Sequence, residues 1–372
     1  MLEMTIKKKK VKNHYVKRDF IHKIKASYVI IIGQRTNGKS FAVKEDIIKN
    51  ALESGEEFAY IRRYKEDCKQ YMVEEYFSDI ICDKQGVRHL EEWSNGRYNT
   101  ISVYQQGIYL SFMDDNGKIT RGQKLGRMFG LSWATHYKSL SFPNITTAVY
   151  EEFVTDEAYL EDEPKRFMHL ISTIFRESSA KVYLVGNSLS RINPFFSEWM
   201  LVNVPKQKPN TVEMYYHKYL DDDNEEQTAK VAVYLTHSTN INSGMFFGNA
   251  AKAITSTVWD SNEQPHLIGR KDDYELLYTM VFMYDRTMFL MELLMQKDTG
   301  AVMWFISPKN TPIQKNTRLI CNKFIPDTMA TVGFVPLSQQ ERSIFNLLRD
   351  EQACYSDNLT GTEFKQCYNM MR

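Results

Sequence analysis

The apolar residues of this chain fall into short segments whose spacing predicts strands and helices in alternation. Residues 29–32 form a short, uninterrupted, β-branched run, which predicts a buried strand. After residue 40 the apolar positions take helical spacing, and Gly55 supplies a stop for the helix. The apolar positions of this predicted helix are Ala42, Val43, Ile47, Ile48, Ala51 and Leu52. The chain therefore passes from a strand, through residues 33–40, into a helix.

Further strands and one strongly amphipathic helix follow. "NITTAVYEEF" (144–153) and "KVYLVGNS" (181–188) each contain an apolar strand, and "EEFAYIRRYKED" (56–67) contains a shorter one. Residues 165–179 place apolar side chains at helical spacing, which predicts one buried helix face. The residues of this face are Phe167, Leu170, Ile171, Ile174 and Phe175. This alternation predicts an α/β domain.

From residue 274 the pattern changes to closely spaced strands. Three strand-like runs, "YELLYTMVFMY", "TMFLMELLM" and "AVMWFISP", are joined by the short turns "DR" and "QKDTG". Helix-like segments follow at 338–350 and 362–371. An antiparallel meander followed by helices predicts a ribonuclease-H-like α/β domain.

A nuclease of that fold needs several carboxylates that converge on two metal ions. Asp285 and Asp298 fall in predicted turns at opposite ends of one strand, and Glu292 lies in the middle of it. This is a poor triad, so we expect no cleavage activity from this domain.

The chain length and a stretch rich in proline and acidic residues predict the domain organisation. A chain of 372 residues is long for a single core, so two domains are expected. The Pro-containing stretch "VNVPKQKPN" (202–210) and the acidic run after it indicate a linker. We therefore expect a first α/β domain over 1–205, a linker region over 206–270 and a ribonuclease-H-like domain over 271–372.

Charge and cysteine content narrow the protein class. The net charge is +1, but residues 7–18 are basic, which is typical of a solvated arm, with contact to nucleic acid as the alternative. The five cysteines form no C-x-x-C pair, which favours a reducing compartment. No apolar run approaches the ~20 residues of a membrane helix, and no apolar segment of a signal peptide follows the N-terminal lysines. We therefore expect a soluble cytoplasmic protein without a membrane partner.

The segment between the first strand and helix carries the strongest motif, G-x-x-x-x-G-K-S. Glycines at its ends allow the backbone N–H groups to curl around phosphate oxygens. Lys39 would reach the β- and γ-phosphates of ATP, and the Ser40 hydroxyl would hold Mg²⁺. The predicted nucleotide-binding residues are Gly33, Gln34, Arg35, Thr36, Asn37, Gly38, Lys39 and Ser40. Because a strand precedes the motif and a helix follows it, we interpret it as a P-loop.

The strand at 145–150 ends in two adjacent carboxylates, which is the arrangement expected of a Walker B strand. Glu151 would steady the Mg²⁺ shell, and Glu152 would polarise the attacking water. A kinase would not need the second acid, and the chain lacks the N-K-x-D motif of a GTPase. These features favour an ATPase.

For two further sites the sequence alone leaves two interpretations each. Asn187, at the end of the strand in 181–188, suits either a sensor of the γ-phosphate or a turn-forming residue. Arg62, Arg63 and Lys65 follow the strand in 56–67, where they suit either a solvated strand end or contact with the phosphates of a nucleotide or nucleic acid.

Taken together, the motifs resemble the DNA-packaging ATPases (encapsidation proteins) of small short-tailed phages with protein-primed linear double-stranded DNA genomes. The resemblance covers nearly the whole chain. It rests on "GQRTNGKS", "YIRRYK", "YKSLSFPNITTAVYEEF", "FRESS", "GNSLSRINPFF" and "MYDRTMFLMELLMQKDTGAVMWF". It implies a homo-oligomeric ring, expected to be a pentamer, that docks on the phage portal (connector) and pumps double-stranded DNA into a preformed capsid. A packaging RNA is a further candidate partner, and the expected location is the host cytoplasm and, transiently, the portal vertex.

The resemblance also implies roles for individual residues. Arg176 matches an arginine finger that acts in trans, Lys138 matches a lysine that reaches the neighbour's nucleotide, and Lys65 matches a residue near the DNA channel. The C-terminal domain would be a degenerate relative of ribonuclease H that binds DNA. Apart from the resemblance, we expect this binding to be electrostatic, through basic residues such as Arg286, Lys309, Lys315 and Arg318. One departure is that the family's Asp-Glu pair is Glu151-Glu152 here, which leaves the role of Glu151 less secure.

Two alternative functions remain. One is a motor of the large-terminase type with an active nuclease domain. The other is a nucleotide-gated DNA-binding scaffold without steady turnover. DNA cleavage would distinguish the first alternative, and steady ATP turnover would exclude the second.

Overall fold

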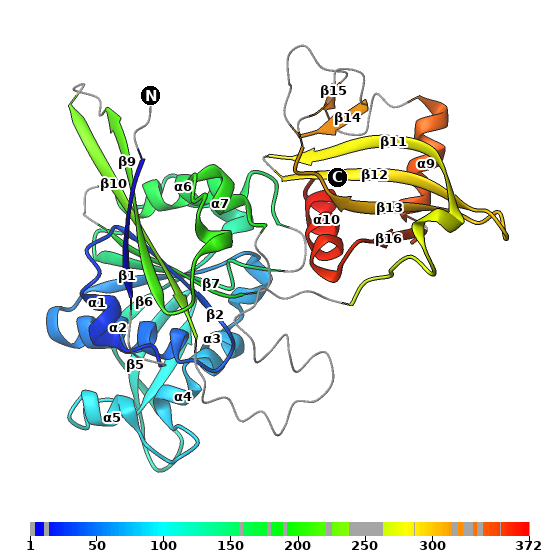
Figure 1. The fold of residues 1–372 in the computed structure, drawn as a ribbon. Coiled ribbons are helices and arrows are strands. Elements are labelled where there is room, and N and C mark those ends of the chain that lie inside the picture. The colour runs from blue at the N-terminus through cyan, green and yellow to red at the C-terminus, as the bar shows by residue number, and fades with distance from the viewer. Residues whose placement is uncertain are drawn as a thin grey trace. The chain divides into compact units, whose positions relative to one another are not determined.

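A computed structural model gives the fold of the chain, which divides into two compact units (Figure 1). The residues that the structure describes are 4–10, 15–155, 159–176, 180–188, 192–220, 225–237, 263–285, 287–311, 313, 318–322, 330–332, 338–349 and 351–371. The first unit comprises Met1–Thr155, Leu160–Ser188 and Pro194–Phe247. The second unit comprises Asp156–Tyr159, Leu189–Asn193 and Gly248–Arg372.

The first unit is built on a ten-stranded sheet in the order β1-β9-β10-β2-β8-β7-β3-β6-β5-β4. Its strands are β1 (Met4–Lys10), β2 (Tyr28–Gly33), β3 (Glu57–Arg62), β4 (Thr100–Tyr104), β5 (Gly107–Met113), β6 (Ile119–Gly130), β7 (Ile145–Glu151), β8 (Lys181–Asn187), β9 (Thr211–Leu220) and β10 (Glu226–Thr236). The strands from β10 to β6 in this order are mutually parallel, and antiparallel pairs flank them on both sides. The predicted α/β domain is confirmed.

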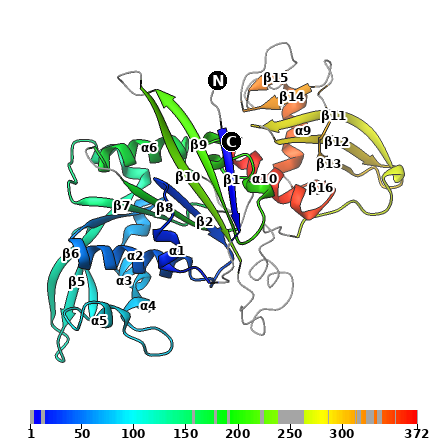
Figure 2. The ribbon, with the colours of Figure 1, turned by 60° about the vertical axis from the view of Figure 1, so that its left-hand side comes forward.

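Helices cover both faces of this sheet (Figure 2). They are α1 (Arg18–His22), α2 (Lys39–Ser54), α3 (Gln70–Tyr76), α4 (Ser78–Ile81), α5 (His89–Trp93), α6 (Glu163–Ile174) and α7 (Pro194–Glu198). Helices α1 to α5 pack on one face with Val29 and Ile31 of β2. On the other face Tyr150 of β7 stacks on Phe167 of α6, their ring centres 5.3 Å apart. Alternate residues of a strand point to opposite faces, which explains why the central strands are apolar throughout.

The predicted helix ends are partly correct. Gly55 caps α2 in the left-handed conformation at φ 76°, as its type predicts. Helix α6 is shorter than the predicted 165–179, because it ends at Ile174 with Phe175 as its C-cap. Arg176 therefore follows the helix.

The predicted boundary at residue 205 is wrong, because residues 211–220 and 226–236 form strands rather than a linker. Residues 221–224 and 238–262 of the predicted linker lie outside the described residues. Strands β9 and β10 belong to the sheet, and β10 pairs in parallel with β2. The prolines and acids before β10 predict a linker, but the apolar run 231–235 that follows them is entirely buried and forms part of this strand. The basic segment 7–18 is also not a free arm throughout, since β1 pairs with β9 as an edge strand.

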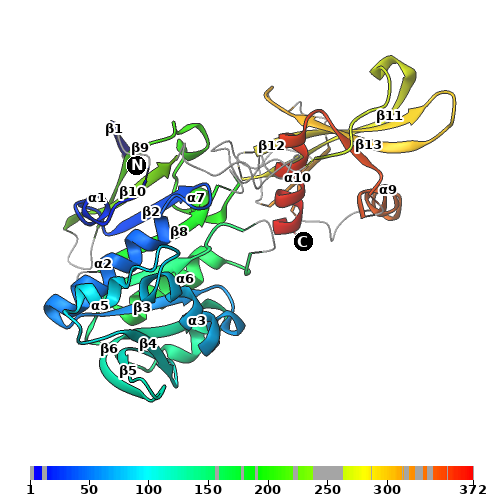
Figure 3. The ribbon, with the colours of Figure 1, turned by 90° about the horizontal axis from the view of Figure 1, so that it is seen from below.

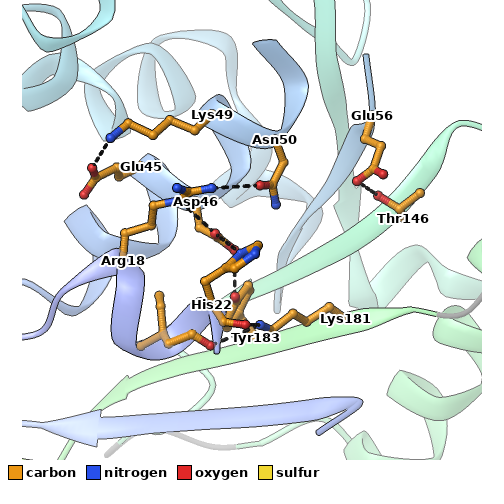
Figure 4. A network of polar contacts seen from close by, with 11 residues as sticks. Arg18, His22, Glu45, Asp46, Lys49, Asn50, Glu56, Thr146, Lys181 and Tyr183 are labelled. Atoms are coloured by element: carbon orange, nitrogen blue, oxygen red, sulfur yellow. Dashed lines mark hydrogen bonds and ion pairs between the residues drawn. The ribbon is translucent and has the colours of Figure 1, made fainter. Parts of the chain in front are cut away.

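A polar network ties α1 to α2 (Figure 4). Asp46 of α2 is fully buried, and its carboxylate accepts hydrogen bonds from Tyr183 Oη at 2.7 Å and Arg18 Nε at 3.2 Å. His22 Nδ1 lies 2.7 Å from the same carboxylate. The Lys181 ammonium donates to two backbone carbonyls at the end of α1. These contacts hold the chain segment that precedes β2 against the helix of the P-loop.

The second unit is built on a six-stranded sheet in the order β15-β14-β11-β12-β13-β16 (Figure 1). Among its described residues, α9 and α10 accompany this sheet (Figure 3). Its elements are β11 (Tyr274–Tyr284), β12 (Thr287–Gln296), β13 (Val302–Pro308), β14 (Arg318–Cys321), β15 (Ala330–Val332), α9 (Gln339–Arg349), β16 (Ala353–Tyr355) and α10 (Asn358–Met371). β11, β12 and β13 form the predicted antiparallel meander, and β14 runs parallel to β11. Phe345 of α9 and Phe364 of α10 share a core with one face of the sheet.

The structure also bears on the membrane expectation. Within the described ranges, no helix has both the length and the apolar character that a membrane crossing needs.

Candidate nucleotide-binding site

A cavity of about 680 Å³ opens where β2, β7 and β8 end and α2 begins. Residues 35–40 line it, together with Glu151 and Glu152 from the end of β7 and Asn187 from the end of β8. Crevices at the carboxyl ends of parallel strands are the usual ligand sites of open α/β sheets. The structure thus brings residues 35–40 of the predicted nucleotide loop together with the residues predicted for the metal ion and the attacking water, whereas Gly33 and Gln34 are not among the described residues that line the cavity.

Both glycines of the loop are required by their surroundings. Gly38 is the N-cap of α2 at φ 82°, in the left-handed region that favours glycine. The ring of Tyr15 packs against it, so that a Cβ there would clash. A Cβ on Gly33 would collide with Thr236 of β10 and with Asn37. Close packing by the protein itself therefore excludes any side chain at these two positions.

Lys39 is held by oxygen atoms of its own loop. Its ammonium donates to the carbonyls of Gly33 at 3.0 Å and Gln34 at 2.6 Å, and it lies 3.1 Å from Asn37 Oδ1 and 3.3 Å from Asn187 Oδ1. Burial lowers the pKa of Lys39 to about 7, and the nearby Glu151 carboxylate opposes that shift. An anionic phosphate in the cavity would favour the charged ammonium.

Glu151 is buried beside the loop hydroxyl. Ser40 Oγ donates to Glu151 Oε2 at 3.3 Å, and the Tyr76 hydroxyl donates to Oε1 at 2.7 Å. Burial raises the pKa of Glu151, while the hydrogen bond from Tyr76 opposes that shift. A hydroxyl and a carboxylate in contact form the kind of oxygen donor set that Mg²⁺ takes. The residues present therefore fit the metal ion, even with the longer Glu151 side chain.

Glu152 differs from its neighbour in exposure and partner. It adopts φ 57°, unusual for a residue with a side chain, and its side chain is exposed. Arg62 Nη2 donates to Glu152 Oε2 at 2.6 Å. Arg62 is therefore not a purely solvated strand end, and its contact with the phosphates of a nucleotide or nucleic acid stays a prediction.

The side chains of Arg63 and Lys65 have different partners within the first unit. Arg63 is buried and pairs with Glu163 of α6 at 2.8 Å, so it is not a solvated strand end. The Lys65 ammonium lies 3.0 Å from the centre of the Trp133 ring, a cation–π contact. Its predicted place near a DNA channel stays a prediction.

Arg176 and Lys138 lie next to each other. Arg176 is exposed, and its guanidinium donates a hydrogen bond to the backbone carbonyl of Lys138. Neither belongs to the described residues that line the cavity. The two residues predicted to reach a neighbour's nucleotide thus share one site on the first unit.

Sequence reasoning missed several residues of the cavity. Tyr15, Phe41, Asp79 and His89 also line it, and Tyr76 orients Glu151. Phe41 directly follows the P-loop serine, so its position could have pointed to it. The others arrive from distant segments and carry no motif.

The second unit shows no metal site in the part of the chain that the structure describes. No group of three or more His, Cys, Asp or Glu residues there could hold a metal ion. Glu292 pairs with Lys271 at 2.6 Å, and Asp285 accepts a hydrogen bond from Asn322 at 2.9 Å. Of the predicted DNA contacts, Arg286 and Lys315 lie outside the described residues, and Arg318 pairs with Glu341 at 2.8 Å.

The first unit and its cavity together define a class of protein. A glycine loop between β2 and α2, with a buried carboxylate opposite its hydroxyl, is the arrangement of a P-loop NTPase fold. The profile of the family described as Podovirus DNA encapsidation protein (Gp16) matches residues 12–221. This is more than half of the chain, which therefore belongs to that family.

Curated relatives match over part of their length. The DNA packaging protein of Bacillus phage B103 is 31% identical over 176 residues, which is 46% of this chain and 47% of that protein. The DNA packaging protein of Bacillus phage phi29 is 28% identical over 176 residues, which is 46% of each chain. The chain thus spans about half the length of the curated relatives it matches.

Two solved structures resemble the fold over nearly the whole chain. The Phi-28 gp11 DNA packaging motor has a TM-score of 0.51 at 14% identity, covering 97% of this chain and 99% of that chain. The bacteriophage Phi-29 viral genome packaging motor assembly has a TM-score of 0.52 at 18% identity, covering 97% and 100%. At these identities the likeness shows the fold alone, a P-loop NTPase unit followed by a further α/β unit.

Proposed function

We propose that the chain is an ATPase and the motor subunit that moves viral double-stranded DNA into a preformed capsid. The observation that carries this proposal is the convergence of Lys39, Ser40 and Glu151 on one cavity, with Glu152 at its edge, in a member of a DNA encapsidation family. The relatives named as DNA packaging proteins support the same activity.

ATP is the proposed substrate of this cavity. Lys39 would exchange the carbonyl oxygens of its own loop for the β- and γ-phosphate oxygens, and the N–H groups of residues 35–40 would surround those phosphates. Ser40 and Glu151 would hold Mg²⁺, whose contribution is to neutralise charge on the phosphate oxygens. Asn187 contacts the Lys39 ammonium and, in this proposal, would respond to the γ-phosphate.

Glu152 is the proposed group that orients the attacking water. Its carboxylate lies at the cavity edge and pairs with the Arg62 guanidinium. An ionised carboxylate can accept a hydrogen bond from the water and draw off its proton as the bond to phosphorus forms. Glu151 is sheltered behind Ser40 and is less able to serve this role.

Neighbouring subunits would complete the site. Arg176 and Lys138 do not line the cavity of their own chain, so we place them at the nucleotide of the next subunit in a ring, with five subunits expected. Such a head-to-tail contact closes into a ring when its rotation allows. The proposed partners are double-stranded DNA, contacted by Lys65, and the capsid portal, with a packaging RNA as a further candidate. The motor would work in the host cytoplasm and at the portal vertex.

Steady-state turnover tests this function. The purified chain should form rings with ATP and hydrolyse it, and double-stranded DNA should stimulate that hydrolysis. Native mass spectrometry reports the ring, and a phosphate-release assay reports turnover. A chain that binds ATP and DNA but shows only a single turnover would instead be the nucleotide-gated scaffold.

The second unit is expected to bind DNA without cutting it, since its described carboxylates are dispersed or paired. Supercoiled plasmid incubated with the full chain and Mn²⁺ should stay intact, and affinity for a labelled duplex should fall steeply with salt. Lys309→Gln should lower the salt slope by about 1 if Lys309 contacts a phosphate. Lys297→Gln, at the turn after β12, is the matched comparison. Nicking that disappears in Asp285→Ala would instead establish a nuclease of the large-terminase type.

A further inference from the structure

A buried ion pair between Arg63 and Glu163 lies next to the turn that carries Glu152. Arg63 Nε lies 2.8 Å from Glu163 Oε2, and Arg63 Nη2 lies 3.1 Å from Glu163 Oε1, a two-point contact. The side chains are 8% and 0% exposed. The hydroxyl of Tyr150 at 2.7 Å and the backbone N–H of Leu160 at 2.9 Å donate to the same carboxylate. Each carboxylate oxygen of Glu163 thus accepts a second hydrogen bond in addition to the one from the Arg63 guanidinium.

The remaining N–H groups of Arg63 point at the main chain that follows β7. Arg63 Nη2 donates to the carbonyl of Phe153 at 2.9 Å, and Nη1 donates to the carbonyl of Glu152 at 3.3 Å. Glu152 is the residue whose backbone adopts the left-handed conformation at φ 57°. Residues with side chains persist in this conformation when their surroundings hold them there. The Arg63 guanidinium therefore holds the strained turn that carries the proposed catalytic carboxylate, through hydrogen bonds to two of its carbonyls.

The same pair also fixes a second part of the reaction machinery. Glu163 is the first residue of α6, and that helix ends at Ile174, two residues before Arg176. The body of α6 packs on β7 through Phe167 and Tyr150. One salt bridge thus connects the turn at Glu152 to the start of the helix that leads to the proposed finger.

We propose that Arg63 and Glu163 are positioning residues for ATP hydrolysis. Their contact sets the direction in which the Glu152 side chain leaves the main chain, and with it the distance from carboxylate to water. This inference rests on the proposed ATPase function. A purely stabilising role explains the geometry less well, because an apolar pair of similar volume often stabilises a fold as much as a buried salt bridge does. Only the guanidinium supplies forked donors to two successive carbonyls.

The experiment removes the donors while filling the space. The variant Arg63→Met/Glu163→Met replaces both charges at once, so that no unpaired charge is left buried. Arg63→Lys keeps the charge for Glu163 but loses the fork. Lys124→Met/Glu57→Met is the matched control, because Glu57 lies at the other end of β3 and pairs with Lys124 at 2.5 Å. Each is measured for melting temperature, ATP affinity and kcat, and again in a Glu152→Gln background by single-turnover hydrolysis.

The expected result separates kcat from binding. Arg63→Met/Glu163→Met should bind ATP with nearly the wild-type affinity but turn over about 100-fold more slowly, the loss typical of a misplacement near 1 Å. Arg63→Lys should change kcat in the same direction, and the control should keep the wild-type kcat. In the Glu152→Gln background the further loss should be small, because both changes act through the same carboxylate.

Three results would overturn the proposal. One is wild-type kcat in the Arg63→Lys variant, which decides the matter alone if the double variant does not fold. Another is an equal loss in the Lys124→Met/Glu57→Met control. The third is an undiminished loss in the Glu152→Gln background, which would show that the pair acts elsewhere. Absence of turnover in the wild-type chain would instead refute the proposed ATPase function.

Discussion

Replacing Glu152 by Gln is expected to leave ATP binding intact while turnover falls by about 10²–10⁴-fold, the usual contribution of a positioned general base. Gln is close in shape to Glu but cannot take a proton from water. ATP binding should persist because the contacts proposed for the phosphates come from residues 35–40, and Glu152 itself contacts Arg62. A fluorescent nucleotide measures affinity, and phosphate release measures turnover.

Glu91→Gln is the matched control for this change. Glu91 is also an exposed carboxylate paired with an arginine, Arg88 at 3.4 Å, and it is not among the described residues that line the cavity. It should keep wild-type turnover. Near-normal turnover in Glu152→Gln would remove Glu152 from the mechanism and leave Glu151 as the acid to test.

The parts of the fold that the sequence predicts are those where local spacing decides the structure. The strand at 29–32, the helix after Lys39 and its stop at Gly55 follow from apolar period and glycine conformation, and all are present. Asn187 and the two acids after residue 150 each follow a predicted strand, and the structure brings them to one cavity because the ends of parallel strands meet at one sheet edge. Such placements need topology but no side-chain detail.

The remaining features depend on contacts between distant segments. Nothing local to Tyr15 shows that its ring packs on Gly38, because the contact exists only once α1 is fixed on α2. Arg62 and Arg63 are adjacent and alike in sequence, yet Arg62 pairs with the exposed Glu152 and Arg63 with the buried Glu163, and nothing local to either arginine distinguishes these partners. The predicted boundary at 205 is wrong because prolines and acidic residues locally predict a linker, whereas the pairing of β10 with β2 joins segments far apart in the sequence.

Subunits that are each inactive for different reasons should restore activity to one another when mixed. Arg176→Ala keeps its P-loop but lacks the finger, and Lys39→Ala keeps its finger but lacks the P-loop lysine. Removal of a trans-acting arginine is expected to lower turnover by about 10³–10⁵-fold. The structure motivates this test because Arg176 is exposed, lies on the carbonyl of Lys138 and is not among the described residues that line its own cavity.

The size of the rescue follows from how the subunits alternate around a ring. In a one-to-one mixture, about one interface in four joins an intact pocket to an intact finger. Turnover should therefore rise well above that of either variant alone and vary with the mixing ratio, with its maximum near equal amounts. Native mass spectrometry confirms that mixed rings have formed, and phosphate release reports the rescue.

Two controls make the result specific. A chain that carries both Arg176→Ala and Lys39→Ala has neither a pocket nor a finger to offer, so its mixture with Arg176→Ala should show no rescue. Arg166→Ala, on the helix that precedes Arg176 and bonded to the carbonyl of Glu161, should keep its own turnover. If mixed rings form and Arg176→Ala with Lys39→Ala stays inactive, Arg176 does not serve the neighbouring nucleotide. Its contact with Lys138 would then belong to the fold of its own subunit, because a residue that acts only within its own chain cannot be supplied by a neighbour.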